Sequence, residues 1–237
     1  MTDLSLAVAS HWKNLLAVSW FLLCFKGYSL YASRAARHVN CLASEMHQYR
    51  VEWMKRMLIR DNRIADTSTI ANLERSVAFF ASTTLLILAG LITVLGSTEK
   101  VIDVISDIPF ATQATTVEWE MKLLLMVVLF VFAFFKFTWS LRQYGFAAVM
   151  MGGAPMPSDE IVSQARTAYA LRISNTMSLA AGNFNTGLRT YYFSMAVLGW
   201  FVNPWIFIAL STLVMLILYR REFKSQTLAE MLMSRSE

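Results

Sequence analysis

The stretch Phe130-Val131-Phe132-Ala133-Phe134-Phe135-Lys136-Phe137-Thr138-Trp139 decides the class of this protein. It lies near the end of residues 119–141, an apolar segment long enough to cross a bilayer as a helix, which takes about 20 residues. An ammonium group at such depth is costly unless it is paired or hydrated. We therefore expect an integral membrane protein in which Lys136 either extends to the headgroups or is held by polar neighbours.

The composition agrees with a membrane location. Hydrophobic residues make up 56% of the 237 positions and charged residues only 16%, whereas a soluble domain carries roughly 25% charged residues. The net charge of +5 comes from clustered basic residues, many of them in the loop 31–76. Such clusters set orientation and attract anionic lipid, so we expect membrane lipids as partners, with anionic headgroups at this loop, and no nucleic acid.

Four hydrophobic segments predict an all-α polytopic membrane helix bundle, with amphipathic helices on the cytoplasmic side. The segments are residues 6–30, 77–95, 119–141 and 191–219. We expect them to form one integral membrane domain over residues 1–237. The first segment lacks the basic start and the cleavage site of a signal peptide, which predicts a retained span.

The loops predict the orientation. The basic loop 31–76 belongs in the cytoplasm and the acidic loop 98–118 outside, which places the N-terminus outside. One conflict remains, because four crossings put the C-terminus outside although the last span ends in the basic run 220–224. Three solutions stay open: a re-entrant hairpin at Asn203-Pro204, an additional crossing by residues 168–188, or an exception to the rule.

Two further stretches have helical patterns. Residues 44–64 carry Met46, Tyr49, Trp53 and Met57 near one stripe with basic residues mostly off it. This pattern suits a helix on the inner leaflet or one buried against the bundle, and both alternatives stay open. Residues 158–181 begin with acids that favour a helix N-terminus.

A polar face on the third span supplies the first candidate site residues. Lys136, Ser140 and Gln143 recur at helical spacing, so their face must look away from lipid. On the antiparallel second span, the residues level with Lys136 are Ser82, Thr83 and Thr84. These groups either join helices by hydrogen bonds or line a path for an ion or substrate.

The segment 175–189 supplies the remaining candidates, Asn183, Asn185 and Arg189. A backbone break at Gly182 and Gly187 would let it bind an anion or line a vestibule, with Arg189 next to a lipid phosphate. The alternative is a loop that packs under the bundle and caps the last helix.

The chain lacks the patterns of common catalytic and metal sites. Cys24 and Cys41 have neither disulfide-framework nor zinc-site spacing, and the three histidines are scattered. We therefore expect no catalytic residue, no metal and no cofactor. A membrane enzyme acting on lipid headgroups would have one weak candidate group: Glu74, Asp61, Asp66 and His47.

Four stretches resemble an uncharacterised family. They are Trp53 to Ile64, Phe79 to Thr84, Phe134 to Gln143 and Phe184 to Phe193. Together they resemble the domain-of-unknown-function family five-nine-nine, multipass membrane proteins of bacteria and plants. The resemblance implies about four spans and no assigned activity, and it agrees with a bacterial inner membrane location.

Two functions remain as hypotheses. The first is a homo-oligomeric channel or transporter-like pore, in which a path lined by Lys136 would favour anions. The second is an accessory or scaffold subunit of a larger membrane complex, supported by 16 Phe, 7 Trp and 14 Met and by amphipathic helices that can dock a membrane-protein partner.

Overall fold

The computed structural model describes residues 2–35, 39–97, 115–160 and 162–233. These residues form helices joined by short turns and contain no strand, which confirms the predicted all-α bundle. The helices are α1 (Thr2–Ala35), α2 (Leu42–Met57), α3 (Ile64–Leu95), α5 (Thr116–Gly152), α6 (Ser163–Val202), α7 (Pro204–Phe223) and α8 (Gln226–Met233). Most of the loop predicted to be acidic and external, residues 98–114, lies outside the described residues.

Among the described residues, three helices are long and apolar enough to cross a membrane. They are Trp12–Ala35 of α1, Ile64–Leu95 and Thr116–Gly152, and they correspond to the first three predicted spans. For the fourth segment, residues 191–219, the structure agrees with the alternative of a hairpin at Asn203-Pro204 and not with a single kinked helix. The chain there reverses between the 40-residue helix α6 and the 20-residue helix α7.

Asn203 and Pro204 cause this reversal. Asn203 takes an extended conformation (φ −159°, ψ 137°), as expected for a residue before proline, and Pro204 cannot donate the hydrogen bond that would continue α6. The Asn203 side chain then accepts a hydrogen bond from the Trp205 backbone N–H at 2.9 Å and caps α7. At Gly199, a Cβ would lie 2.6 Å from Leu210, so glycine allows the two helices to approach closely.

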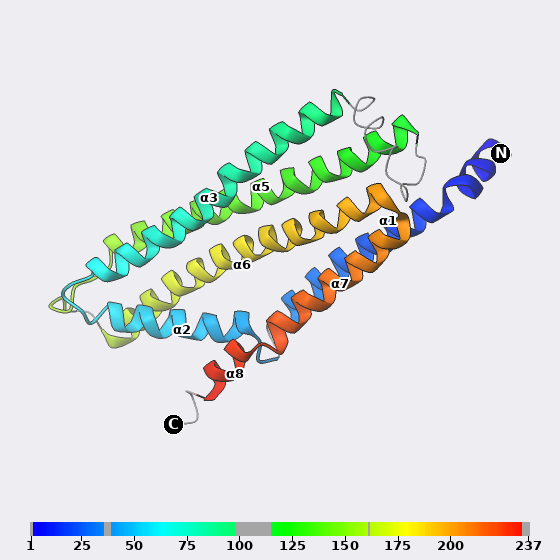
Figure 1. Cartoon of the computed structure of the whole chain (residues 1–237). Helices are drawn as coiled ribbons and strands as arrows, with labels where there is room; N and C mark the ends of the chain where they lie inside the picture. The colour runs from blue at the N-terminus through cyan, green and yellow to red at the C-terminus, as the bar shows by residue number, and fades with distance from the viewer. Residues whose placement is uncertain (1, 36–38, 98–114, 161, 234–237) are drawn as a thin grey trace.

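Three long helices, α3, α5 and α6, lie side by side, and α1 and α7 form a second pair beside the C-terminal half of α6 (Figure 1). α5 packs against both α3 and α6. α2 lies along the opposite half of α6, and α8 packs beside α2. The N-terminus and the C-terminus lie at opposite ends of the molecule (Figure 1).

A heptad pattern explains the packing of α5. Its buried residues recur at alternating steps of three and four: Trp119, Leu123, Met126, Phe130, Ala133, Phe137, Ser140, Tyr144, Ala147 and Met151. A repeat of 3.5 residues keeps one seam facing its neighbours along the whole helix, as in a coiled coil. The seam therefore continues beyond the length that a bilayer requires.

The end of the bundle that carries α2 has its own apolar core. Met54 and Met57 of α2 are fully buried there, together with Met151 and Met177 of α5 and α6. α2 is thus buried against the bundle, and it ends at Met57 instead of reaching residue 64. α6 begins at Ser163, a few residues after the predicted start.

Aromatic rings fill the contact of α3, α5 and α6 halfway along. Phe137 is fully buried and contacts the rings of Phe80, Phe184 and Tyr191, with centroids 5.5–5.7 Å apart. Its ring lies over Gly187 of α6, where any Cβ would overlap it. Because its neighbours hold the ring, it cannot move aside cheaply.

The change Gly187→Ala is therefore expected to destabilise the protein by about 1–3 kcal/mol through overpacking. The measurement is the unfolding midpoint in detergent, followed by circular dichroism. Gly182→Ala is the matched control, because a Cβ at Gly182 meets no atom within 4 Å and alanine is the better helix former. Equal midpoints for the two variants would contradict this packing.

Candidate functional site

The polar face predicted on α5 is turned toward α6. Ser140 is fully buried, and its hydroxyl donates to the Ala180 carbonyl at 2.7 Å. The Gln143 side-chain oxygen accepts a hydrogen bond from the Asn183 amide at 2.8 Å. These two contacts join the helices about one turn apart and remove polar groups from the lipid-facing surface.

Lys136 is held by the same asparagine. Its ammonium donates to the Asn183 side-chain oxygen at 3.2 Å and lies 5.6 Å from the Phe132 ring centroid. The Asn183 amide nitrogen also donates to the Leu179 carbonyl at 3.1 Å. Asn183 therefore satisfies both Lys136 and Gln143 through opposite ends of one amide.

The hydroxyl residues of α3 do not form the predicted shell around Lys136. Thr84 lies 2.6 Å from the Tyr191 hydroxyl, and Thr83 donates to the Phe79 carbonyl at 2.8 Å, whereas Ser82 is exposed. The hydroxyl residues of α3 were expected at the same depth as Lys136, but α5 turns the Lys136 side chain toward α6 and not toward α3. The amide that pairs with Lys136 comes from the segment expected to be a loop.

The expected backbone break at Gly182 and Gly187 is also wrong, because both lie inside the continuous helix α6. Asn185 is exposed on this helix. Instead of the predicted vestibule or loop, this segment is part of a helix, and Asn183 lies on the side of the helix that contacts α5. Glycine here serves the close approach of Phe137 and not a turn.

Arg189 belongs to a junction of four helices. Its guanidinium lies 3.7 Å from the Glu222 carboxylate of α7, with side chains 16% and 14% exposed. It also lies 5.4 Å from the Tyr28 ring of α1. Glu222 accepts a hydrogen bond from the Ala43 N–H at 3.1 Å, so a carboxylate neutralises both Arg189 and the N-terminal end of α2. In this structure Glu222 takes the place predicted for a lipid phosphate.

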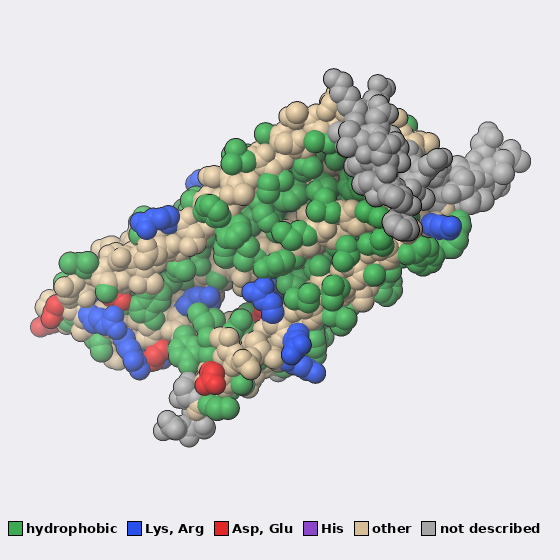
Figure 2. Space-filling model, viewed as in Figure 1, with side chains coloured by type: hydrophobic (Ala, Val, Ile, Leu, Met, Phe, Trp, Pro, Cys, Tyr) green, Lys and Arg blue, Asp and Glu red, His purple; other side chains and the backbone are tan. Residues whose placement is uncertain are grey.

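Figure 2 shows one face of the protein, with hydrophobic side chains over much of the long helices and most of the Lys and Arg side chains toward the end that carries α2 and α8. An opening lies between α2 and α6, with basic side chains on both sides. This asymmetry of charge is the pattern that the positive-inside rule describes.

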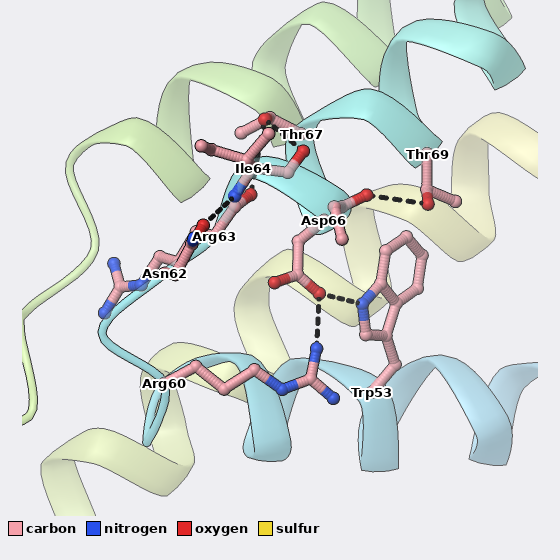
Figure 3. A network of polar contacts seen from close by, with 9 residues as sticks. Trp53, Arg60, Asn62, Arg63, Ile64, Asp66, Thr67 and Thr69 are labelled. Atoms are coloured by element: carbon pink, nitrogen blue, oxygen red, sulfur yellow. Dashed lines mark hydrogen bonds and ion pairs between the residues drawn. The ribbon is translucent and has the colours of Figure 1, made fainter.

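A second polar network ties α2 to the start of α3 (Figure 3). Asp66 is 2% exposed, and one of its oxygens accepts from the Trp53 indole at 2.6 Å and from Arg60 at 3.0 Å. As an acid in the first turn of α3, it also favours the helix dipole. Arg63 donates to the Ala154 and Pro155 carbonyls and holds the loop after α5.

The weak enzyme candidate is not assembled. His47 contacts the Ser178 hydroxyl at 2.9 Å, and Arg50 donates to the same hydroxyl at 3.3 Å. Burial lowers the pKa of Arg50 below its ordinary value. Asp66 pairs with Trp53 and Arg60 instead of with His47.

The sequence did not predict a group of polar contacts at the end of the bundle where α5 begins and α6 ends. Asn14 donates to the Glu118 carboxylate at 2.9 Å and accepts from the Trp200 indole at 2.9 Å. Lys122 is buried, with its ammonium 5.6 Å from the Trp200 ring. The signals were Lys122 inside an apolar segment and the Thr115–Glu118 capping box. The contacts of these residues with α1 and α6 depend on tertiary packing, which the sequence does not show.

The described residues contain no group of three or more His, Cys, Asp or Glu side chains that could hold a metal ion. Cys24 and Cys41 are both buried free thiols. The polar side chains around Lys136 instead pair across helices, which keeps them off the lipid-facing surface.

Long apolar helices with polar groups paired between them define a multipass helical membrane protein. The chain belongs to the family described as protein of unknown function, DUF599, whose model matches residues 16–227. No curated protein and no solved structure gives a significant match. The family thus agrees with the resemblance noted in the sequence and assigns no activity.

Asn183→Leu is expected to destabilise the protein by about 1–3 kcal/mol, because the buried Gln143 and the partly buried Lys136 lose a hydrogen-bond partner. Unfolding midpoints in detergent measure the loss. Lys136→Met in the Asn183→Leu background is expected to recover part of it, since the unpaired ammonium is gone. Asn185→Leu, on an exposed position of the same helix, is the control and should stay within about 0.5 kcal/mol of the wild type; equal losses at both asparagines would contradict the role of Asn183.

Proposed function

We propose that the chain crosses a bacterial inner membrane five times, with the N-terminus outside and the C-terminus in the cytoplasm. α6 has 40 residues and is about 60 Å long, twice what a bilayer core requires. α7 returns from Asn203 and ends in Arg220 and Arg221 beside α2. A fifth crossing by α6 removes the conflict between the span count and the basic tail.

We further propose that the protein functions as a homo-oligomeric channel or transporter-like pore. The observation that carries this proposal is the exposed face of α3. Only 17% of the apolar window of α3 is buried, compared with 33% in α1 and 39% in α5. The small or hydroxyl-bearing residues on this exposed face are Ser82, Ala89, Gly90 and Thr93.

Small residues at such positions let membrane helices approach closely, and hydroxyl groups add interhelical hydrogen bonds. Within one chain, the space among α3, α5 and α6 is filled by Phe80, Phe137, Phe184 and Tyr191. A path through the membrane would therefore run between subunits, bordered by α3. Lys136, which Asn183 holds on the other side of α5, would influence this path only from a distance.

One observation favours the alternative, an accessory or scaffold subunit. The inner end of the bundle extends beyond the proposed spans, and large apolar side chains are exposed at its tip. They are Ile59, Ile64, Val149 and Val162. Apolar residues exposed to the cytoplasm mark a contact surface when they gather in one place, and another membrane protein could cover this tip.

The topology predicts which side of the membrane two exposed positions face. A cysteine in place of Lys224 should react with a membrane-impermeant maleimide only after right-side-out vesicles are permeabilised, whereas Gly96→Cys should react in intact vesicles. Both natural cysteines are buried, so the unmodified protein provides the background. Labelling of the Lys224→Cys variant in intact vesicles would exclude five crossings.

The pore predicts an oligomer of identical subunits in nanodiscs by native mass spectrometry, and chloride or potassium efflux from liposomes loaded with KCl. Gly90→Leu should shift the protein toward monomer and reduce the efflux at least tenfold, because the new side chain separates the α3 helices. Gly27→Leu on α1 is the matched control, since both glycines face open space in the single chain.

A wild-type protein that is monomeric and leaves liposomes sealed would overturn the pore. A stoichiometric complex with a different protein, lost on Ile64→Glu, would favour the accessory subunit.

A further inference from the structure

A hollow lies on the exposed surface of α5, and the proposed pore does not use it. The hollow measures about 880 Å³ and is lined by eight residues of α5. These are Phe132, Phe135, Lys136, Thr138, Trp139, Leu141, Arg142 and Phe146. Two of them are cations and none is an acid, so the hollow complements a negative charge.

Lys136 is fixed in place before any ligand arrives. Its ammonium is bound to Asn183 at 3.2 Å and rests on the Phe132 ring. Lys26 of α1 reaches the same ring, at 6.0 Å from its centroid. Two ammonium groups therefore meet at Phe132, and the restricted motion of Lys136 lowers the entropic cost of binding an anion.

Arg142 is the second cation of the hollow. It is exposed, and its guanidinium lies 5.5 Å from the Phe146 ring of the next turn. A guanidinium leaves its planar donors available for a phosphate while one face rests on an aromatic ring. Lys136 and Arg142 lie six residues apart on α5, about 9 Å along the helix axis and about 120° apart around it. Both line the hollow, so a phosphate-bearing group in it would be reached by the long side chains of both residues.

The order of side chains along α5 resembles the order of groups in a phospholipid. Phe132 and Phe135 come first, Lys136 and Trp139 follow, and Arg142 and Phe146 come last. Trp139 is 49% exposed and Phe135 is 65% exposed, and tryptophan is enriched where the acyl region meets the headgroups. Trp119 and Trp139 bound the predicted span, about 30 Å apart along a helix, which sets Trp139 at the inner interface.

We propose that this hollow binds the phosphate headgroup of an anionic phospholipid from the inner leaflet, between Lys136 and Arg142, with an acyl chain along Phe132 and Phe135. The site is distinct from the basic loop 31–76 and requires neither the pore nor the oligomer. The ligand is a lipid because the aromatic residues continue the hollow into the apolar span, where free phosphate has no favourable contact.

Native mass spectrometry of delipidated protein in detergent, titrated with phosphatidylglycerol or phosphatidylcholine, tests the site. We expect phosphatidylglycerol to bind and phosphatidylcholine to bind much more weakly. Removing both cations with Lys136→Met and Arg142→Gln should lower the affinity for phosphatidylglycerol about 25-fold, at about fivefold per charge. Inorganic phosphate in excess should leave the lipid bound.

Two further variants keep the result interpretable. Arg142→Gln alone leaves the Lys136–Asn183 contact intact, and it should weaken binding about fivefold. Lys136→Arg keeps the charge and should retain binding. The control Lys55→Met with Arg56→Gln removes two exposed charges from α2 and should leave the affinity unchanged. Equal affinity for both lipids would overturn the proposal. Loss of lipid binding in the α2 control variant, or displacement of the lipid by inorganic phosphate, would also overturn it.

Discussion

The structure depends on the heptad seam of α5. Because its buried residues return every 3.5 positions, one helix can contact α3 and α6 along its full length. Phe137 and Gly187 show how tight this contact is, since the ring occupies the space that any larger residue would need. The other elements attach to this three-helix unit: α2 and α7 pack on α6, and α1 packs mainly on α7.

The same seam decides where polar groups can lie. Ser140, Gln143 and Lys136 are placed on α5 so that one asparagine and one carbonyl of α6 satisfy them. In hydrocarbon, an unsatisfied polar group costs several kcal/mol, so this pairing lets a lysine remain within an apolar stretch. Elsewhere on α6 an ion pair serves the same purpose, as the partly buried contact of Arg189 with Glu222 illustrates.

The features of greatest functional interest lie on the outside of this unit. α3 leaves most of its apolar window exposed, and α5 exposes a hollow with two cations. A tightly packed interior and a chemically varied exterior suit a protein that acts through neighbouring molecules: further copies, another protein, or lipid. The DUF599 family, to which the chain belongs, gives this class of protein no activity.

The sequence alone determined the helical class, the first three spans and the polar face of α5, because lipid imposes length, hydrophobicity and helical spacing on every span. It left a kink or a reversal at Asn203-Pro204 open, because a proline marks either a kink or an end. It also read the amide-rich segment around Asn183 as a loop. Only the tertiary structure decided that Lys136 contacts Asn183 rather than Ser82, Thr83 or Thr84. The sequence gives the depth of a residue along its helix. Which neighbour its side chain contacts depends on how the helices pack around it.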